Sequence, residues 1–209
     1  MPHTRSRPKT EEKFQNAILK LIADEGCGSL GINSVAQVAG ADKVLIYRYF
    51  GNFKGLLQRV AETRKWLPTA DEVMQSLPSS QLDSLSLLRE IDRIIQHHIR
   101  SDASTHQLVR WRRTKVCPIC EQFTDEWRAL WQAIPSLLSE GLSSVQRALW
   151  AQACSLLSLT VEAELCGEAV KQESLAGIAN LLEAAELDVD VESRAQTRVE
   201  ELRLPTNLL

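Results

Sequence analysis

Lysine, arginine and tyrosine side chains gather in one short stretch of this chain, where they could contact a polyanion. Lys43, Tyr47 and Arg48 fall within six successive residues. A lysine at a helix start can reach phosphate oxygens or base edges, and a tyrosine combines a hydroxyl donor with a flat apolar body. These residue types favour contact with a nucleic-acid backbone. The alternative is that Tyr47, and Tyr49 beside it, pack a small apolar core.

Polar residues on either side extend this candidate surface. Asn33 and Ser34 open the preceding apolar pattern, where side chains and backbone N–H groups can bind phosphate. Lys54 opens the following one. The full predicted set of DNA-binding residues is Asn33, Ser34, Lys43, Tyr47, Arg48, Tyr49 and Lys54.

Two short helices must position these side chains, one over residues 32–39 and one over residues 43–50. Apolar residues of the first recur with helical spacing: Ile32, Val35, Ala36 and Ala39. Gly40 can adopt the positive φ of a helix C-cap, and the Asp42 carboxylate can cap the second helix. Two short helices joined by such a turn predict a helix-turn-helix, whose second helix enters the DNA major groove.

The second helix is expected to bury one side and expose the other. We expect a buried side made of Val44 or Leu45, part of Tyr47, and Phe50. Lys43 and Arg48 fall on the opposite side, together with one edge of each tyrosine. That division would leave the basic residues free to meet DNA.

The same stretch resembles the signature of the tetracycline-repressor (TetR) family. The resemblance is carried by Val35-Ala36, Ala39-Gly40, Ile46-Tyr47-Arg48-Tyr49-Phe50 and Lys54-Gly55-Leu56-Leu57. It covers about the first quarter of the chain in detail, and beyond that only length and helical patterning. Three positions depart from the family pattern: Gly31 replaces the usual threonine, Asp42 the usual serine, and Gly55 the common glutamate.

The resemblance implies a fold class and a function. It implies an all-α protein with a three-helix DNA-binding head, followed by a larger helical domain for ligand binding and dimerisation. A homodimer of this kind binds a palindromic operator in double-stranded DNA and responds to a small-molecule effector. Lys54 matches the family's phosphate-contacting lysine. A ligand-responsive transcriptional regulator, more often a repressor, is therefore the expected function.

Charge is distributed unevenly along the chain. Residues 1–65 carry 11 Lys and Arg against 6 Asp and Glu, whereas residues 66–209 carry 13 against 21, for an overall charge of −3. A basic module on an acidic body suits DNA binding through one end, because phosphate contacts supply most non-specific affinity. A solvated charged surface is the simpler explanation of such a split taken alone.

Composition narrows the class of protein. The chain of 209 residues contains no apolar run long enough to cross a membrane, and its basic amino terminus lacks the apolar core of a secretory signal. We therefore expect a cytoplasmic protein without a membrane partner, with its five cysteines as reduced thiols. Phosphate-binding glycine loops, nucleophile elbows and HExxH motifs are missing from the sequence, so no enzyme and no cofactor is predicted.

The rest of the chain predicts helix after helix. We expect a DNA-binding domain over residues 1–52, an effector-binding and dimerisation domain over 53–187, and a flexible tail over 188–209. Within the second domain, a helix from about residue 52 should continue to Trp66, and residues 68–81 should form a linker. Pro135 or, if that proline is tolerated, Gly141 should end a later helix.

The last two predicted helices, residues 143–166 and 173–187, are apolar on two sides. A helix of this kind must bury both sides, which a body of this size cannot easily do alone. We therefore expect the pair to meet its copy in a second subunit, forming a four-helix interface about a two-fold axis. The predicted interface residues are Val145, Leu149, Leu156, Leu175, Ile178 and Leu182.

Aromatic residues of the body could line an effector cavity. Trp111, Trp127 and Trp131 are candidate walls, and His98 lies on a stripe of isoleucines, three residues after Ile95. Helical bundles commonly bind small molecules between their helices. Ordinary core packing explains the tryptophans nearly as well, and a buried, hydrogen-bonded histidine explains His98.

Cys117 and Cys120 form a single CxxC pair. Structural zinc needs four ligands, and the sequence offers no second pair, so no metal site is predicted. Cys120 also continues the apolar stripe of Phe123 and Trp127, which favours a structural role. A thiol-based redox sensor or helical thiol enzyme using Cys117 and Cys120 is the alternative function. Cys27, after the first predicted helix, is interpreted as a small space-filling residue.

Overall fold

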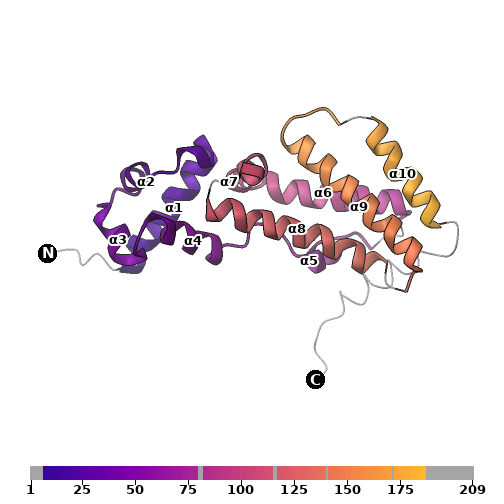
Figure 1. Cartoon of the computed structure of the whole chain (residues 1–209), viewed down its shortest axis with the longest axis horizontal. Helices are drawn as coiled ribbons and strands as arrows, with labels where there is room; N and C mark the ends of the chain where they lie inside the picture. Colours follow the sequence, from indigo (N-terminus) through magenta and orange to yellow (C-terminus); the bar gives the residue numbers. More distant parts are fainter. Residues whose placement is uncertain (1–6, 80–81, 115–116, 140, 171, 187–209) are drawn as a thin grey trace, which may run out of the picture. The chain divides into compact units, whose positions relative to one another are not determined.

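A computed structural model describes residues 7–79, 82–114, 117–139, 141–170 and 172–186 (Figure 1). These residues form α-helices and two short 3₁₀ helices, without a strand among them, which confirms the all-α prediction. The predicted tail over 188–209 lies outside the described residues. Within the described ranges, no helix is long and apolar enough to cross a membrane.

The helices follow one another with short connections. The first part of the chain contains α1 (Arg7–Glu25), η1 (Cys27–Ser29), α2 (Ile32–Ala39), α3 (Val44–Phe50), α4 (Phe53–Thr63) and α5 (Ala70–Gln75). The second part contains α6 (Ser84–Arg100), α7 (Ala103–Trp111), η2 (Arg112–Thr114), α8 (Pro118–Leu138), α9 (Ser144–Leu165) and α10 (Gln172–Glu186).

The chain divides into two compact units that do not follow the sequence order. The first unit combines Met1–Trp66 with Ile99–Glu126, and the second combines Leu67–His98 with Trp127–Leu209. The first unit thus contains α1 to α4, α7 and the start of α8. The predicted division after residue 52 was drawn from the helix-turn-helix motif alone, and it remains a prediction about function.

The core of the first unit is built on α1, which packs against α2 and α7. Phe14 is fully buried and meets Phe50 of α3 edge to face, with ring centroids 6.3 Å apart. Ile46 of α3 is also fully buried, whereas Val44 is 61% exposed. Val44 or Leu45 was expected on the buried side of this helix, and this is wrong for Val44. The buried residue Ile46 was not predicted. Ile46 and Phe50 are four residues apart, so they share the helix face that meets α1.

The turn between α2 and α3 confirms two predictions. Gly40 adopts the left-handed conformation at φ 57°, and its N–H donates to the carbonyls of Ala36 and Gln37. The Asp42 carboxylate accepts a hydrogen bond of 2.8 Å from the N–H of Val44. Backbone carbonyls at the end of α2 and a backbone N–H at the start of α3 therefore find hydrogen-bond partners within the turn itself. These bonds fix where α3 begins.

Three expected boundaries differ in the structure. The helix α4 ends at Thr63 rather than Trp66. The expected linker contains α5, because the hydroxyl of Thr69 and the carboxylate of Glu72 cap each other's backbone N–H groups. Pro135 lies inside α8, which confirms the alternative in which this proline is tolerated, although the helix ends at Leu138, before Gly141.

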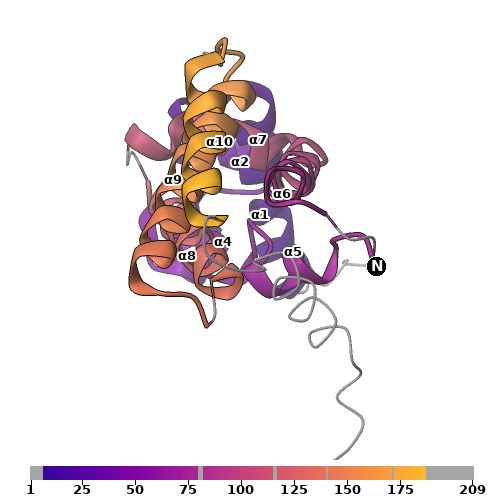
Figure 2. The same ribbon diagram turned by 90° about the vertical axis from the view of Figure 1, so that its right-hand side faces the viewer.

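In the second unit, α9 contacts three other helices. The indole N–H of Trp127 in α8 donates to Ser158 of α9 at 3.0 Å. Gln96 of α6 donates to Glu164, also in α9. Figure 2 shows α10 beside α9, and the two helices are in extensive contact.

This packing changes the predicted dimer surface. Ile178 and Leu182 of α10 are each only 2% exposed, because they lie in the core that α10 forms with α9. They are therefore corrected from interface residues to core residues. The side chain of Leu175 lies outside the described residues.

Gly55, one of the departures from the family pattern, has a steric explanation. It lies in the first turn of α4, where its N–H donates to the Asn52 side chain at 2.8 Å. A Cβ at this position would lie 2.2 Å from the backbone oxygen of Phe50. Backbone cannot move aside as a flexible side chain can, so only glycine fits here.

Gly55→Ala should therefore destabilise the protein, although alanine normally stabilises a helix relative to glycine. We expect a loss of about 1–3 kcal/mol, the usual range for overpacking. Urea denaturation followed by circular dichroism measures the change.

The matched control is Gly177→Ala in α10, where a Cβ would meet Leu156 at an ordinary 3.7 Å. This variant should gain up to about 1 kcal/mol from helix propensity. A stabilising Gly55→Ala substitution would contradict the steric explanation.

Candidate nucleic-acid interface and a buried thiol cluster

The exposed side of α3 presents the predicted contact residues. Tyr47 is 54% exposed, and Lys43 and Arg48 are exposed beside it. The core-packing alternative therefore does not account for Tyr47. Tyr49 is half-buried, with its ring near Phe50 and the Arg7 guanidinium 5.2 Å from its centroid. Tyr49 thus has a structural role that Tyr47 lacks.

The start of α2 lies next to the start of α3. The ammonium of Lys43 donates a hydrogen bond of 3.2 Å to the Asn33 side chain, and both residues are exposed. Gly31 at the N-cap supplies no side-chain acceptor, so the first turn of α2 has no side-chain cap. Lys54 is exposed at the start of α4. Basic side chains and uncapped backbone N–H groups on one surface suit phosphate binding.

Ser34 differs from the other predicted contacts. It is half-buried, and its hydroxyl lies 3.1 Å from the carbonyl oxygen of Ser29 and 3.2 Å from that of Gly31. The hydroxyl proton is therefore used within the fold. Its predicted role as a phosphate donor would require giving up these bonds.

The segment after α4 is held to other helices of the first unit. The Arg64 guanidinium pairs with the Asp102 carboxylate at 2.6 Å, and Asp102 caps the start of α7. The backbone N–H of Trp66 donates to Glu126 in α8 at 2.9 Å. Arg64 also lies over the Trp66 ring, 4.9 Å from its centroid. The end of α4 is thus connected to both α7 and α8.

The Asp102 carboxyl of this junction has a lowered pKa. Burial alone would raise its pKa, but hydrogen bonds from Ser104 and Thr105 and the charge of Arg64 outweigh burial. They lower the pKa of Asp102 to about 2. The carboxylate is therefore ionised over the whole physiological pH range.

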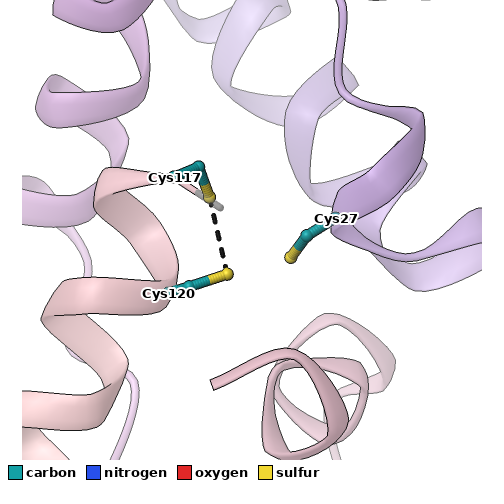
Figure 3. Close-up of side chains that lie close together, drawn as sticks. All are labelled: Cys27, Cys117 and Cys120. Carbon is teal, nitrogen blue, oxygen red and sulfur yellow. Dashed lines mark hydrogen bonds between the residues drawn. The ribbon is translucent and has the colours of Figure 1, made fainter. Parts of the chain in front are cut away.

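Three thiols lie together inside the first unit. Figure 3 shows Cys27 directing its sulfur toward Cys117 and Cys120, and the three sulfurs are all within 4.8 Å of one another. The Cys117 and Cys120 sulfurs share a hydrogen bond of 3.5 Å, and all three residues are buried. Sequence analysis missed Cys27, because nothing local in the chain relates it to a CxxC pair so far away.

The cluster perturbs the acidity of its members. Hydrogen bonds from Cys120 and then from Cys27 lower the pKa of Cys117 well below that of a free thiol. The same bonds raise the pKa values of Cys120 and Cys27. The Cys117 thiol is therefore the most acidic of the three.

Trp111 supports the thiol cluster. A Cβ on Gly26 would lie 2.4 Å from the Trp111 indole nitrogen, and one on Gly28 would lie 2.8 Å from its ring. The ring therefore fills the space left by the two glycines that flank Cys27. Its predicted role as a cavity wall is corrected to packing in the first unit.

The other predicted effector residues belong to the second unit or its edge. His98 is exposed, because the buried apolar stripe of α6 passes beside it through Leu87, Leu88, Ile91, Ile95 and Ile99. Trp127 is buried, and its indole nitrogen is already hydrogen-bonded.

Trp131 is the predicted effector residue that borders a pocket. The pocket has a volume of about 600 Å³ and is lined by Trp131, Gln132, Pro135, Ser136, Ser139, Gly141, Arg147, Ala148, Ala151 and Ser155. The Trp131 indole N–H is buried without a hydrogen-bond partner.

Solved structures share this fold. HlyIIR, a hemolysin II transcriptional regulator, matches with a TM-score of 0.53 and 18% sequence identity, covering 86% of this chain and 98% of its own. A TetR-family transcriptional regulator from Streptomyces coelicolor matches with a TM-score of 0.54 and 15% identity, covering 93% and 88%. No family model and no curated protein matches the chain. The chain therefore has the all-α fold of TetR-family transcriptional regulators.

The low pKa of Asp102 predicts how stability depends on pH. Its folded pKa of about 2 lies below the unfolded value of about 3.9. The ionised carboxylate therefore stabilises the fold above about pH 4, and this contribution is lost as pH falls toward 2. Because the side chain is 38% exposed, we expect the contribution to stay below about 1 kcal/mol.

Urea midpoints measured at about pH 7 and about pH 3 test this expectation. Asp102→Asn keeps a capping side chain but removes the charge, so the acid-induced loss of stability should become smaller. Asp24→Asn, at an exposed position in α1, is the control and should parallel the wild type. Parallel profiles for Asp102→Asn and the wild type would contradict the assignment.

Proposed function

We propose that this protein is a cytoplasmic transcriptional regulator of the TetR family and that it acts as a repressor. One observation carries the proposal: Lys43, Tyr47 and Arg48 are exposed on the second helix of a helix-turn-helix. The shared fold with solved transcriptional regulators supports it. The excess of basic residues before residue 66 supports it as well.

The proposed complex is a homodimer on a palindromic operator. Each subunit would insert α3 into a major groove. The centres of the two half-sites would lie one helical turn of DNA apart, about 34–36 Å, or a multiple of that distance. Lys43 and Tyr47 would contact bases or backbone at the centre of this surface. Asn33 and Lys54 would bind flanking phosphates.

The exposed side of α9 is the proposed dimer surface. Val145 is 67% exposed and Leu159 is 53% exposed, and Leu149 and Leu156 are half-buried. Large apolar side chains in water favour burial against a partner. A second copy of α9, related by a two-fold axis, would cover them.

The proposed regulation requires an effector that distinguishes two conformations. An effector lowers operator affinity only if it binds the other conformation more tightly. A small molecule in the pocket lined by Trp131 could be such an effector. That pocket includes Ala148 and Ala151 of α9, so an occupant would lie next to the proposed dimer surface.

Operator binding by α3 predicts a specific pattern of variants. Wild-type protein should first enrich one palindromic sequence from a random duplex library. On that sequence, Lys43→Ala and Tyr47→Ala should each weaken binding by about 1–3 kcal/mol if the side chain contacts a base. If Lys43 contacts only phosphate, its loss should instead reduce the slope of log affinity against log salt concentration by about one.

Arg89→Ala is the matched control, since Arg89 is an exposed arginine of α6 in the second unit. Its affinity should equal that of the wild type across the salt series. Unchanged affinity in both α3 variants, or the absence of any enriched sequence, would remove the proposal.

The proposed dimer predicts sensitivity to charge on α9. Leu159→Asp should shift the protein from dimer to monomer in sedimentation velocity, because an unpaired carboxylate would be buried at the interface. Val38→Asp, at another exposed apolar position in α2, should leave the dimer intact. Equal sedimentation of both variants would contradict this surface.

A further inference from the structure

We propose that Cys27, Cys117 and Cys120 form a three-sulfur binding site for a thiophilic ion, with trivalent arsenic as the ion that fits best. The three sulfurs come from two places, the turn after α1 and the start of α8. All three already lie within 4.8 Å of one another and face a common point (Figure 3).

The spacing of the sulfurs suits a shared ion better than a disulfide. A metal–sulfur bond of about 2.3 Å places the sulfurs about 4 Å apart in a planar three-coordinate complex, and about 3.5 Å apart in the pyramidal complex of trivalent arsenic. The Cys117 and Cys120 sulfurs are 3.5 Å apart, and all three sulfurs lie within 4.8 Å of one another, so small side-chain movements suffice to close the site. A disulfide between Cys117 and Cys120 would require closure to about 2.05 Å and would leave Cys27 unused.

The ligand set excludes ions that need a fourth protein ligand. Among the described residues, no histidine or carboxylate joins the three sulfurs. Structural zinc takes four protein ligands, and its catalytic form completes three with water. The cysteines are at most 7% exposed, which leaves little access for that water. Soft ions satisfied by three thiolates remain, such as monovalent copper and trivalent arsenic.

Charge then distinguishes between these two ions. Three thiolates around trivalent arsenic form a neutral complex, whereas around monovalent copper they retain two negative charges. An uncompensated charge in a buried site carries a large desolvation cost. A neutral complex needs no compensating cation beside the sulfurs. Trivalent arsenic therefore fits this buried site better than copper.

The binding reaction balances without an oxidant. Arsenous acid, As(OH)₃, exchanges its three hydroxyl groups for three thiols. Three As–S bonds form and three As–OH bonds break, and each thiol proton leaves with a hydroxide as water. No electron is transferred, so the reduced protein is the reactive form.

Ion binding would restrain the proposed DNA-binding surface. Cys27 lies in η1, between α1 and α2, while Cys117 and Cys120 begin α8. A common ion would therefore cross-link the turn before the helix-turn-helix to a helix that continues into the second unit. This regulatory consequence rests on the proposed function, whereas the binding site itself does not.

Arsenite titration of the reduced full-length protein tests the site. Native mass spectrometry should find one arsenic per chain, with the loss of three protons. Arsenic X-ray absorption of the wild-type complex should count three sulfur neighbours and no oxygen. Zn²⁺ and Cu(I) serve as comparison ions, and both should bind more weakly than arsenite.

Three variants and one control assign the ligands. Cys27→Ser, Cys117→Ser and Cys120→Ser should each weaken arsenite binding by more than the ~10–100-fold that loss of a supporting partner costs a metal site. Cys166→Ser, which alters a half-buried cysteine of the second unit, should bind like the wild type. The absorption measurement on wild-type protein stands even if a variant fails to fold.

Two outcomes would overturn the site. If X-ray absorption counts only two sulfur neighbours of arsenic in the wild type, and Cys27→Ser binds arsenite with unchanged affinity, the site is only the Cys117–Cys120 pair. Absence of arsenite binding to the reduced wild type would remove it altogether.

Operator binding separates this inference from the proposed function. Arsenite should change operator affinity about 5–150-fold in the wild type, the usual range of allosteric coupling, and leave Cys27→Ser unaffected. Three-sulfur binding in a protein that enriches no DNA sequence would uphold the ion site and overturn the proposed function. Operator binding that arsenite leaves unchanged would overturn the regulatory consequence alone.

Discussion

Burial of the apolar face of α1 is the constraint on which the first unit depends. Phe14 and its neighbours are excluded from water by α2, α3 and α7 at the same time. Burying a side chain of this size contributes about 1.5–3 kcal/mol. Because Ile46 and Phe50 belong to this core, α3 can turn Tyr47 and Arg48 outward. The exposed basic surface is thus a consequence of which side of α3 the core requires.

Glycines mark the places where backbone or aromatic rings approach closely. At Gly55, the Phe50 carbonyl leaves no room for a Cβ, so a family glutamate cannot be accommodated here. Gly26 and Gly28 make room for Trp111, which packs over the turn that carries Cys27. The departures from a family pattern are therefore part of a consistent local structure.

Local patterns were predictable from the sequence, and long-range packing was not. Gly40 and Asp42 determine a turn with their own chemistry, so the helix-turn-helix and the all-α class were predicted correctly. Ile178 and Leu182 have the helical spacing of any buried stripe, and spacing cannot say whether the covering helix is α9 or a second subunit. His98 was placed on the isoleucine stripe, although a stripe recurring every four residues leaves it outside. Cys27 lies far from Cys117 in the chain, so only the packing of α1 could bring them together.

The connections at the end of α4 explain why the first unit includes more than the helix-turn-helix. Arg64 pairs with Asp102, and Trp66 donates to Glu126, so moving the end of α4 away from α7 and the start of α8 would break both contacts. The three thiols lie in the same unit, where the turn after α1 meets the start of α8. Any displacement of the start of α8 must therefore either carry the helix-turn-helix with it or break these contacts. The chain passes from one unit to the other after Trp66, His98 and Glu126, so the segment after α4 is not the only covalent connection between them.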